Sequence, residues 1–100
     1  MNIPQQVKEK VKAIDSQADV ILFGSRARGD AREDSDWDFL VLLKNPLSSK
    51  EEDLIRNTIY RIELEVDEII TPVIEDKPHW EMLAVTPFYK NVQRDGIHIT

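Results

Sequence analysis

The chain has 100 residues, which is enough for one domain with a modest core and too few for a catalytic domain plus a separate substrate domain, so we expect residues 1–100 to form a single domain. Its 41% hydrophobic and 32% charged residues exclude a disordered chain, and the absence of cysteine excludes disulfides, thiolate chemistry and cysteine-type zinc sites. A net charge of −6 opposes direct binding to nucleic acid, and no apolar run is long enough for a membrane span or a signal peptide, so we expect a cytoplasmic protein.

Apolar residues in the first half of the chain predict one helix and two strands. In the first segment they recur at helical spacing, at Ile3, Val7, Val11 and Ile14. Residues 18–23 (ADVILF) form an apolar, β-branched run that ends at Gly24, as a buried strand does, and residues 37–43 (WDFLVLL) form a second such run. Between them, Ser25 begins a segment that fits the first turn of another helix.

The second half predicts two helices with a strand between them. Ser48 and Ser49 each precede a glutamate by three residues, which predicts a helix beginning near Lys50. The alternation in residues 64–70 predicts a third strand that ends at Thr71 and Pro72. Thr86-Pro87 starts a short final helix that stops at Gly96, and the last residues, IHIT, predict a brief edge strand. This order of helices and strands predicts an α/β (α+β) domain.

Two aspartates stand at the head of the second strand. Asp36 and Asp38 are two residues apart, so on a strand both carboxylates point to the same face and repel each other. A cation or a shared proton must compensate such a pair, and carboxylate oxygens suit Mg²⁺ or Mn²⁺. The pair therefore predicts a metal site, against the simpler interpretation of two solvated residues at the entrance of a strand.

A segment that suits phosphate binding comes just before the acidic pair. Gly24 permits close backbone approach, and Ser25 with the free N–H groups of a helix start and nearby arginines suits a phosphate chain. Gly24 and Gly29 also have the glycine spacing of a P-loop, but Asp30 and Ala31 replace the lysine and hydroxyl residue that must follow. We therefore reject the P-loop.

Together, these residues resemble a known family. Gly24-Ser25, Ala27-Arg28-Gly29 and Ser35-Asp36-Trp37-Asp38, followed by an apolar run, are similar to the G-S-x-A-x-G…S-D-x-D signature of the DNA polymerase β-like nucleotidyltransferases, and most similar to their minimal, MNT (MntA-type) branch. The resemblance covers about a fifth of the chain. It implies a nucleotidyltransferase fold, with a small mixed β-sheet flanked by helices, that uses ATP and Mg²⁺ (or Mn²⁺).

The resemblance also implies a role for each residue. Gly24 and Ser25 would hold the β- and γ-phosphates, and Arg28 is a better match than Arg26 for a further phosphate contact. Asp36 and Asp38 would bind metal. The family's third carboxylate lies on a neighbouring strand, where Asp67 is the best match; Glu65 shares its face and stays an alternative. These three carboxylates would form the catalytic set.

The implied function is transfer of AMP to a hydroxyl group of a partner protein. Minimal members of the family occur with a small helical HEPN toxin, which they modify as antitoxins, and the resemblance implies such a partner here. One alternative is transfer to a small molecule such as an aminoglycoside. The other is a module of the same fold that neutralises its partner by binding alone. His79 and His98 have no metal-ligand spacing, and the aromatic residues Trp80, Phe88 and Tyr89 are expected in the core or an interface.

Overall fold

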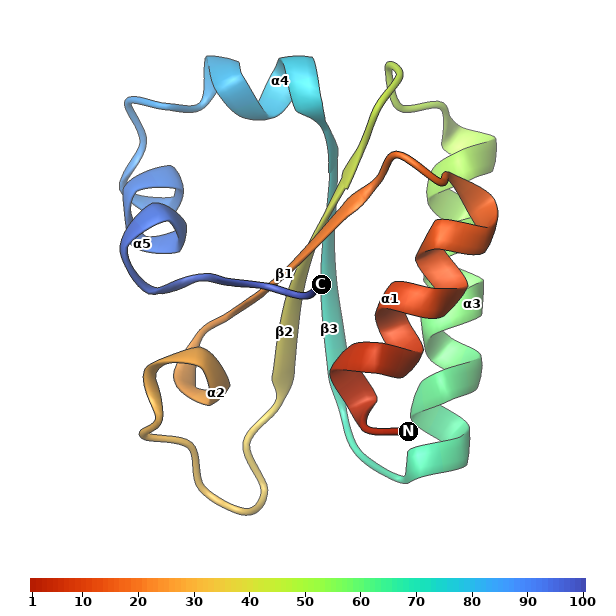
Figure 1. Ribbon diagram of the computed structural model, residues 1–100, viewed down its shortest axis with the longest axis vertical. Coiled ribbons are helices and arrows are strands. Elements are labelled where there is room, and N and C mark those ends of the chain that lie inside the picture. Colours follow the sequence, from red (N-terminus) through yellow and green to blue (C-terminus); the bar gives the residue numbers. More distant parts are fainter.

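In the computed structural model, which describes residues 1–100, the chain forms one mixed sheet with helices on both faces (Figure 1). The elements in chain order are α1 (Ile3–Ile14), β1 (Asp19–Phe23), α2 (Ser25–Arg28), β2 (Trp37–Leu43), α3 (Ser49–Val66), β3 (Ile70–Asp76), α4 (Lys77–Met82), α5 (Pro87–Asp95) and β4 (Ile97–His98). The strand order is β3-β2-β1-β4. β1 pairs antiparallel with β2 and β4, whereas β2 and β3 are parallel, so the predicted mixed sheet flanked by helices is confirmed.

The two long helices each begin just after a residue whose side chain caps the helix. Asn2 caps α1 by accepting a hydrogen bond from the Gln5 amide at 2.9 Å, and Ser48 caps α3 by accepting one from the Glu51 amide at 3.2 Å. The helix predicted near Lys50 is therefore confirmed, with Ser48 as its cap. Both helices turn an apolar stripe towards the sheet, as their spacing predicts.

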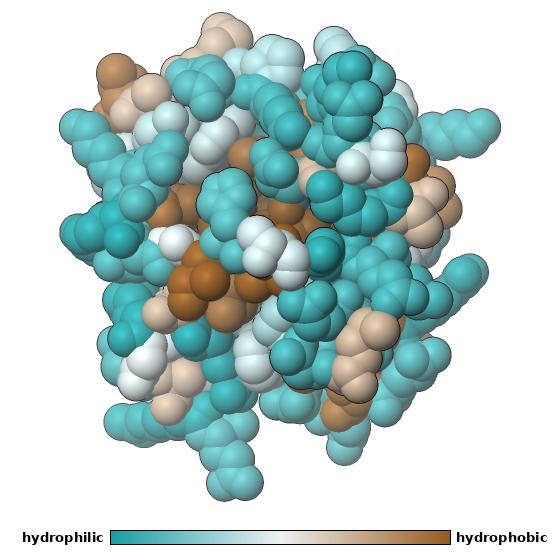
Figure 2. Space-filling model, in the orientation of Figure 1, coloured by the Kyte–Doolittle hydropathy of each residue, from teal (hydrophilic) through white to brown (hydrophobic).

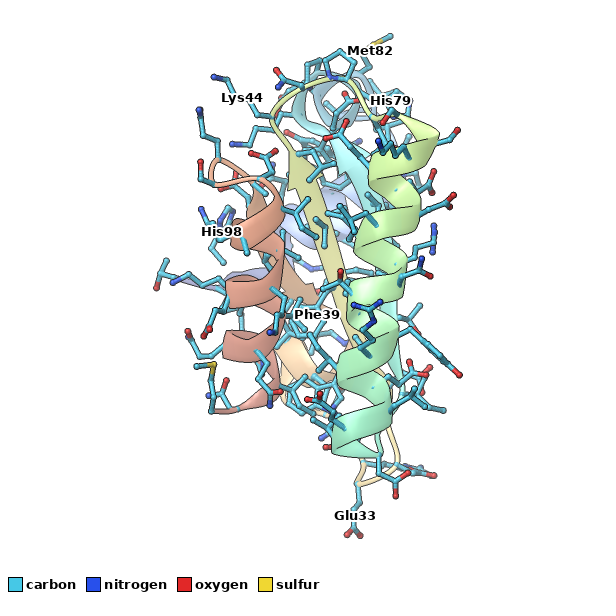
Figure 3. The ribbon with its side chains drawn as sticks, turned by 90° about the vertical axis from the view of Figure 1, so that its right-hand side faces the viewer. Glu33, Phe39, Lys44, His79, Met82 and His98 are labelled. Carbon is cyan, nitrogen blue, oxygen red and sulfur yellow. The ribbon has the colours of Figure 1, made fainter.

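β2 is buried on both faces, which explains its unbroken apolar sequence. Phe39, Val41 and Leu43 face α1 and α3, which lie side by side over the sheet with Phe39 between them (Figure 3). Leu40 and Leu42 face the other way and pack in a smaller cluster with Trp80 of α4. The ring centres of Trp80 and Phe88 are 5.6 Å apart in an edge-to-face contact, so these aromatic residues belong to the core as expected.

The strand predicted over residues 64–70 is wrong. α3 continues through Val66, and Asp67 ends it in the left-handed conformation with φ 56° and ψ 40°. Ile62 and Val66 are four residues apart, so the apparent alternation is the tail of the helical pattern. β3 begins only at Ile70 and runs through Pro72, which is tolerated because β3 is an edge strand.

α4 and α5 lie on the far side of the sheet from α1 and α3, where Trp80 and Val92 pack in the smaller cluster. Thr86 caps α5 by accepting a hydrogen bond from the Tyr89 amide at 3.2 Å, and Gly96 follows its last residue, as predicted. β4 is the brief edge strand expected near the end of the chain. The short helix α4 was not predicted, because six residues that include Pro78 give no readable period. None of the helices combines the length and apolar character needed to cross a membrane.

The exterior is mostly polar. On the face shown in Figure 2 hydrophilic side chains predominate, and apolar ones gather near the middle, over the strands. Larger apolar side chains are nevertheless exposed elsewhere, among them Leu64 on α3 and Met82 and Val85 around the link from α4 to α5.

Candidate active site

The acidic pair lies where the chain enters β2. Asp36 is exposed in the loop just before the strand, and Asp38 is half-buried at its second residue. Because side chains alternate along a strand, Asp38 faces the same side of the sheet as Leu40 and Leu42. Burial raises the pKa of Asp38, the negative charge of Asp36 raises it further, and Arg28 partly offsets both effects. A cation bound beside Asp38 would relieve the repulsion that destabilises its ionised form.

Gly24 joins β1 to α2 directly against this carboxylate. Its φ of 75° lies in the region that favours glycine, and a side chain here would collide with the Asp38 carboxylate. The backbone of the segment that we expect to bind phosphate is therefore packed against one member of the acidic pair. Ser25 follows as the first residue of α2, and Gly29 ends that helix with a φ of 82°.

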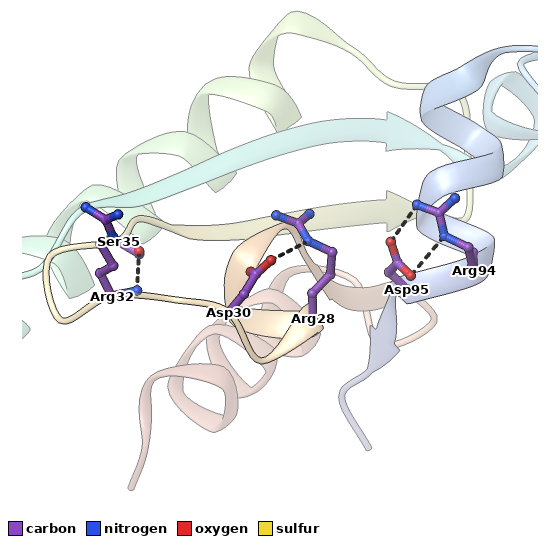
Figure 4. Close-up of polar contacts among 6 residues, drawn as sticks. All are labelled: Arg28, Asp30, Arg32, Ser35, Arg94 and Asp95. Atoms are coloured by element: carbon purple, nitrogen blue, oxygen red, sulfur yellow. Dashed lines mark hydrogen bonds and ion pairs between the residues drawn. The ribbon is translucent and has the colours of Figure 1, made fainter.

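Arg28 extends from α2 beside the same region. Its Nε donates to Asp30 Oδ2 at 3.3 Å, and nearly half of its side chain is exposed (Figure 4). Its charge also acts on Asp38 and on Asp95 at the end of α5, which shows that it lies near both carboxylates. An exposed guanidinium whose only carboxylate partner is on the surface remains available to a phosphate.

Arg26 has a structural role instead. Its guanidinium lies 4.5 Å from the centre of the Trp37 ring and donates to the carbonyl oxygens of Ser35 at 2.8 Å and Glu33 at 3.2 Å. Glu68 lies 3.6 Å from the same guanidinium and accepts a hydrogen bond from Trp37 Nε1 at 3.1 Å. These contacts tie α2, the acidic loop and the turn before β3 together, so Arg26 is committed to holding the loop that carries Asp36.

Both candidates for the third carboxylate lie at the end of α3 rather than on a strand. Asp67 is exposed at the end of α3, beside the loop residues Glu33 to Ser35, and Glu65 lies within α3. No group of three His, Cys, Asp or Glu side chains in the structure is placed to hold a metal ion. The residue of β3 that pairs with Asp38 is Thr71, which is exposed on the same face. The expectation that Asp67 lies on the neighbouring strand is wrong, because β3 begins only at Ile70, three residues after Asp67.

Sequence reasoning missed the contribution of α5. A pocket of about 230 Å³ lies between the end of β1, α2 and α5, and Asn91 and Asp95 bring its polar groups from the last helix. No local motif marks these residues, because they meet Gly24 and Arg28 only through the fold. The histidines stay outside: His79 pairs with Glu75 at 3.0 Å, and His98 is exposed on β4 (Figure 3).

The fold defines the class of protein first. Over 99% of this chain it matches a crystal structure of a toxin–antitoxin with AMP-PNP, with a TM-score of 0.71, 17% identity and 73% of that chain covered. A second match is a mutant of the toxin–antitoxin MntA-HpeT, with a TM-score of 0.69 and 16% identity over 100% of this chain and 73% of that one. The fold is the nucleotidyltransferase fold.

Sequence comparison then gives the family. Residues 3–93 match the nucleotidyltransferase domain, and the chain belongs to this family as a minimal nucleotidyltransferase, which confirms the resemblance. It is 36% identical over 104 residues to the "Putative protein adenylyltransferase MJ0141" of Methanocaldococcus jannaschii, spanning 99% of this chain and 100% of that protein. It is 29% identical over 101 residues to "Putative protein adenylyltransferase MJ0604" of the same organism, over 96% of each.

Proposed function

We propose that this nucleotidyltransferase moves AMP from ATP to a hydroxyl group of a partner protein, with Mg²⁺ or Mn²⁺ held at Asp36 and Asp38. The observation that carries the proposal is the contact between Gly24 and Asp38, which puts a phosphate-binding segment against an acidic pair. The two relatives named as protein adenylyltransferases support the choice of donor and of acceptor class. The toxin–antitoxin neighbours support a toxin as the partner, and a small helical HEPN-type protein is our candidate.

The residues present fit a magnesium ion. Mg²⁺ is commonly bound by one or two carboxylates together with substrate phosphates, so Asp36 and Asp38 suffice without a third protein ligand. When bound, the ion would neutralise charge on the phosphates of ATP. One structural neighbour is a mutant in which two aspartates, spaced as Asp36 and Asp38 are, have been changed to glutamate. We assign no metal to Asp67, which caps α3 in this structure.

The chain's own groups would orient the nucleotide for transfer. Gly24 and Ser25 would hold the β- and γ-phosphates, and Arg28 would contact a phosphate from the side. The acceptor oxygen would attack the α-phosphorus, forming a new O–P bond as the bond to the β-phosphate oxygen breaks and pyrophosphate leaves. The hydroxyl proton would pass to water. Catalysis of this kind is mainly positioning and charge stabilisation, which small rigid domains can supply.

Label transfer tests the proposed reaction. The protein and Mg²⁺ are incubated with the product of the adjacent gene, as the candidate partner, and with ATP labelled at the α- or the γ-phosphate. We expect the partner to gain label from the α-phosphate and none from the γ-phosphate. Asp36→Asn and Asp38→Asn should each reduce transfer at least about a hundredfold, because each removes a charge that acts on the phosphates and metal. Asp34→Asn, an exposed carboxylate of the same loop, is the matched control and should transfer normally.

The second candidate is neutralisation of the partner by binding alone. The observation that favours it is that the β3 residue paired with Asp38 is Thr71, which is not a carboxylate. Full neutralisation of the partner by Asp38→Asn, combined with no label transfer from any nucleoside triphosphate by the unmodified protein, would establish this alternative. Label on an added aminoglycoside, and none on the partner, would instead establish the small-molecule reaction.

A further inference from the structure

A pocket continues from the proposed phosphate site towards α5. It encloses about 230 Å³ and is bounded at one end by Gly24 and Arg28. Beyond these residues it is lined by Phe23, Phe88, Asn91, Val92 and Asp95. Because Gly24 also touches the Asp38 carboxylate, the pocket and the acidic pair share one wall.

The floor of the pocket is apolar and rigid. Phe23 and Phe88 meet edge to face with 5.3 Å between their ring centres, and Val92 between them and the sheet is buried. Phe88 also packs against the buried Trp80, which fixes its ring. An apolar, aromatic floor with a few polar groups at its rim is typical of sites for organic ligands with a flat ring.

The far end of the pocket presents a carboxylate, which accepts hydrogen bonds but donates none to a phosphate. Hydrogen bonds from Arg94, at 3.0 and 2.9 Å, lower the pKa of Asp95, and the charge of Arg28 lowers it slightly further (Figure 4). Asp95 is therefore ionised, and although Arg94 pairs with it, its carboxylate oxygens have lone pairs left to accept further hydrogen bonds. A triphosphate tail does not suit this end, whereas hydroxyl or amino groups do.

We propose, on the basis of the function proposed above, that this pocket is the nucleoside subsite of the enzyme. The base lies on the floor formed by Phe23 and Phe88, and Asp95 accepts hydrogen bonds from ribose hydroxyl groups, as acidic residues do in other nucleotide sites. The Asn91 side chain, which offers one donor and one acceptor group, bonds the edge of the base. An amide of this kind matches the neighbouring amino group and ring nitrogen of adenine. The polar groups that select the nucleotide thus come from α5.

Two ligands separate the nucleoside subsite from the phosphate site. The affinities of Mg²⁺–ATP and Mg²⁺–tripolyphosphate are measured by calorimetry for the unmodified protein and for Asn91→Ala and Asp95→Asn. We expect each variant to bind ATP about tenfold more weakly, the loss that one unmade hydrogen bond gives. Asn91→Ala should bind tripolyphosphate unchanged, and Asp95→Asn should bind it no more weakly, because that change removes a negative charge that acts on Arg28. Gln93→Ala is the matched control, because this exposed amide of the same helix lines a different pocket and should change neither affinity.

The outcomes distinguish this proposal from the one on which it rests. Unchanged ATP affinity in both variants, with normal binding by the unmodified protein, removes the nucleoside subsite and leaves the proposed function in place. Equal weakening of ATP and tripolyphosphate shows that the pocket holds phosphates, which also overturns the inference. If the unmodified protein binds neither ligand, both proposals fail. Asn91 is exposed on the helix surface, so thermal unfolding of Asn91→Ala should match that of the unmodified protein.

Discussion

Asp38 illustrates how a site residue is held in a state that the fold itself disfavours. Its folded pKa is raised above the ordinary value by burial and by Asp36. Ionised Asp38 therefore reduces the stability of the metal-free protein at neutral pH, and this reduction disappears as the pH falls below the unfolded pKa. The repulsion between Asp36 and Asp38 also favours cation binding, because a bound cation would offset the negative charges that no side chain fully balances.

The first prediction follows from that sign. In metal-free protein, Asp38→Asn should raise the melting temperature at neutral pH by up to about 4 °C, although it removes a proposed metal ligand. Near pH 3 the Asp38 carboxyl group of the unmodified protein is mostly protonated in the folded and the unfolded state. The two proteins should then have the same melting temperature. Calorimetric melts of both proteins with a chelator present measure this effect. A melting temperature that falls at neutral pH would show that the Asp38 charge stabilises the fold, contrary to its raised pKa. Asp34→Asn serves as the control.

Arg26 and Glu68 show what motif matching cannot resolve at single residues. Arg26 matches the chemistry of a phosphate ligand, and Glu68 interrupts an apolar pattern, yet in the structure both contact Trp37 and each other. The three side chains are far apart in sequence, so only the fold reveals that they form one contact. Arg28, two residues along, is left as the exposed arginine of this segment.

At the scale of elements, the bounds of a helix or strand were predicted well where the sequence pattern fits only one kind of structure. β1 and β2 were predicted almost to the residue, because each is an apolar run bounded by glycine or by acidic residues. The boundary between α3 and β3 was misplaced because residues 64–70 satisfy both a helical and an alternating pattern. The actual boundary depends on Asp67 adopting a left-handed conformation, which the sequence permits without requiring.

The edge strand β3 is protected by residues that appeared to argue against a strand. The Ile70 amide donates to the Glu63 carboxylate at 2.9 Å rather than to another strand, and Pro72 has no amide hydrogen. These features block pairing with a further chain along the first part of the edge. They also give Glu63 a structural task, so it is not free to serve as the missing carboxylate.

The second prediction tests the end of α3. Asp67→Asn should leave both folding stability and label transfer nearly unchanged, because asparagine also tolerates the left-handed conformation. Asp67→Val should lower the free energy of unfolding by about 1–2 kcal/mol, since a β-branched side chain is strained there. Denaturant titration measures the stability, and the partner-labelling assay measures transfer. Loss of transfer in a normally folded Asp67→Asn would return this residue to the catalytic set and contradict the assignment made here.

At the scale of the whole molecule, the site lies open at one end of the sheet and the acceptor must come to it. α1 and α3 cover one face of the sheet, while α5 forms one wall of the nucleoside pocket on the other (Figure 1). Within this chain, two side-chain hydroxyl groups belong to the segments beside Asp38. They are Thr71, which pairs with Asp38, and Ser25, which follows Gly24. In the reaction proposed above, the partner docks near the acidic loop, and the net charge of −6 influences its approach.

The last prediction concerns the rate of that approach. The proposed HEPN-type partner is expected to act on RNA, and a protein that binds RNA carries basic surface, so an acidic nucleotidyltransferase should attract it electrostatically. Between about 50 mM and 500 mM salt, the association rate should fall roughly tenfold, whereas the dissociation rate should change little, because salt screens long-range attraction more than close contacts. Stopped-flow or surface-based kinetics with Asp38→Asn measure both rates without turnover. An association rate that ignores salt would instead indicate docking through apolar side chains, for which Met82 and Val85 are the exposed candidates.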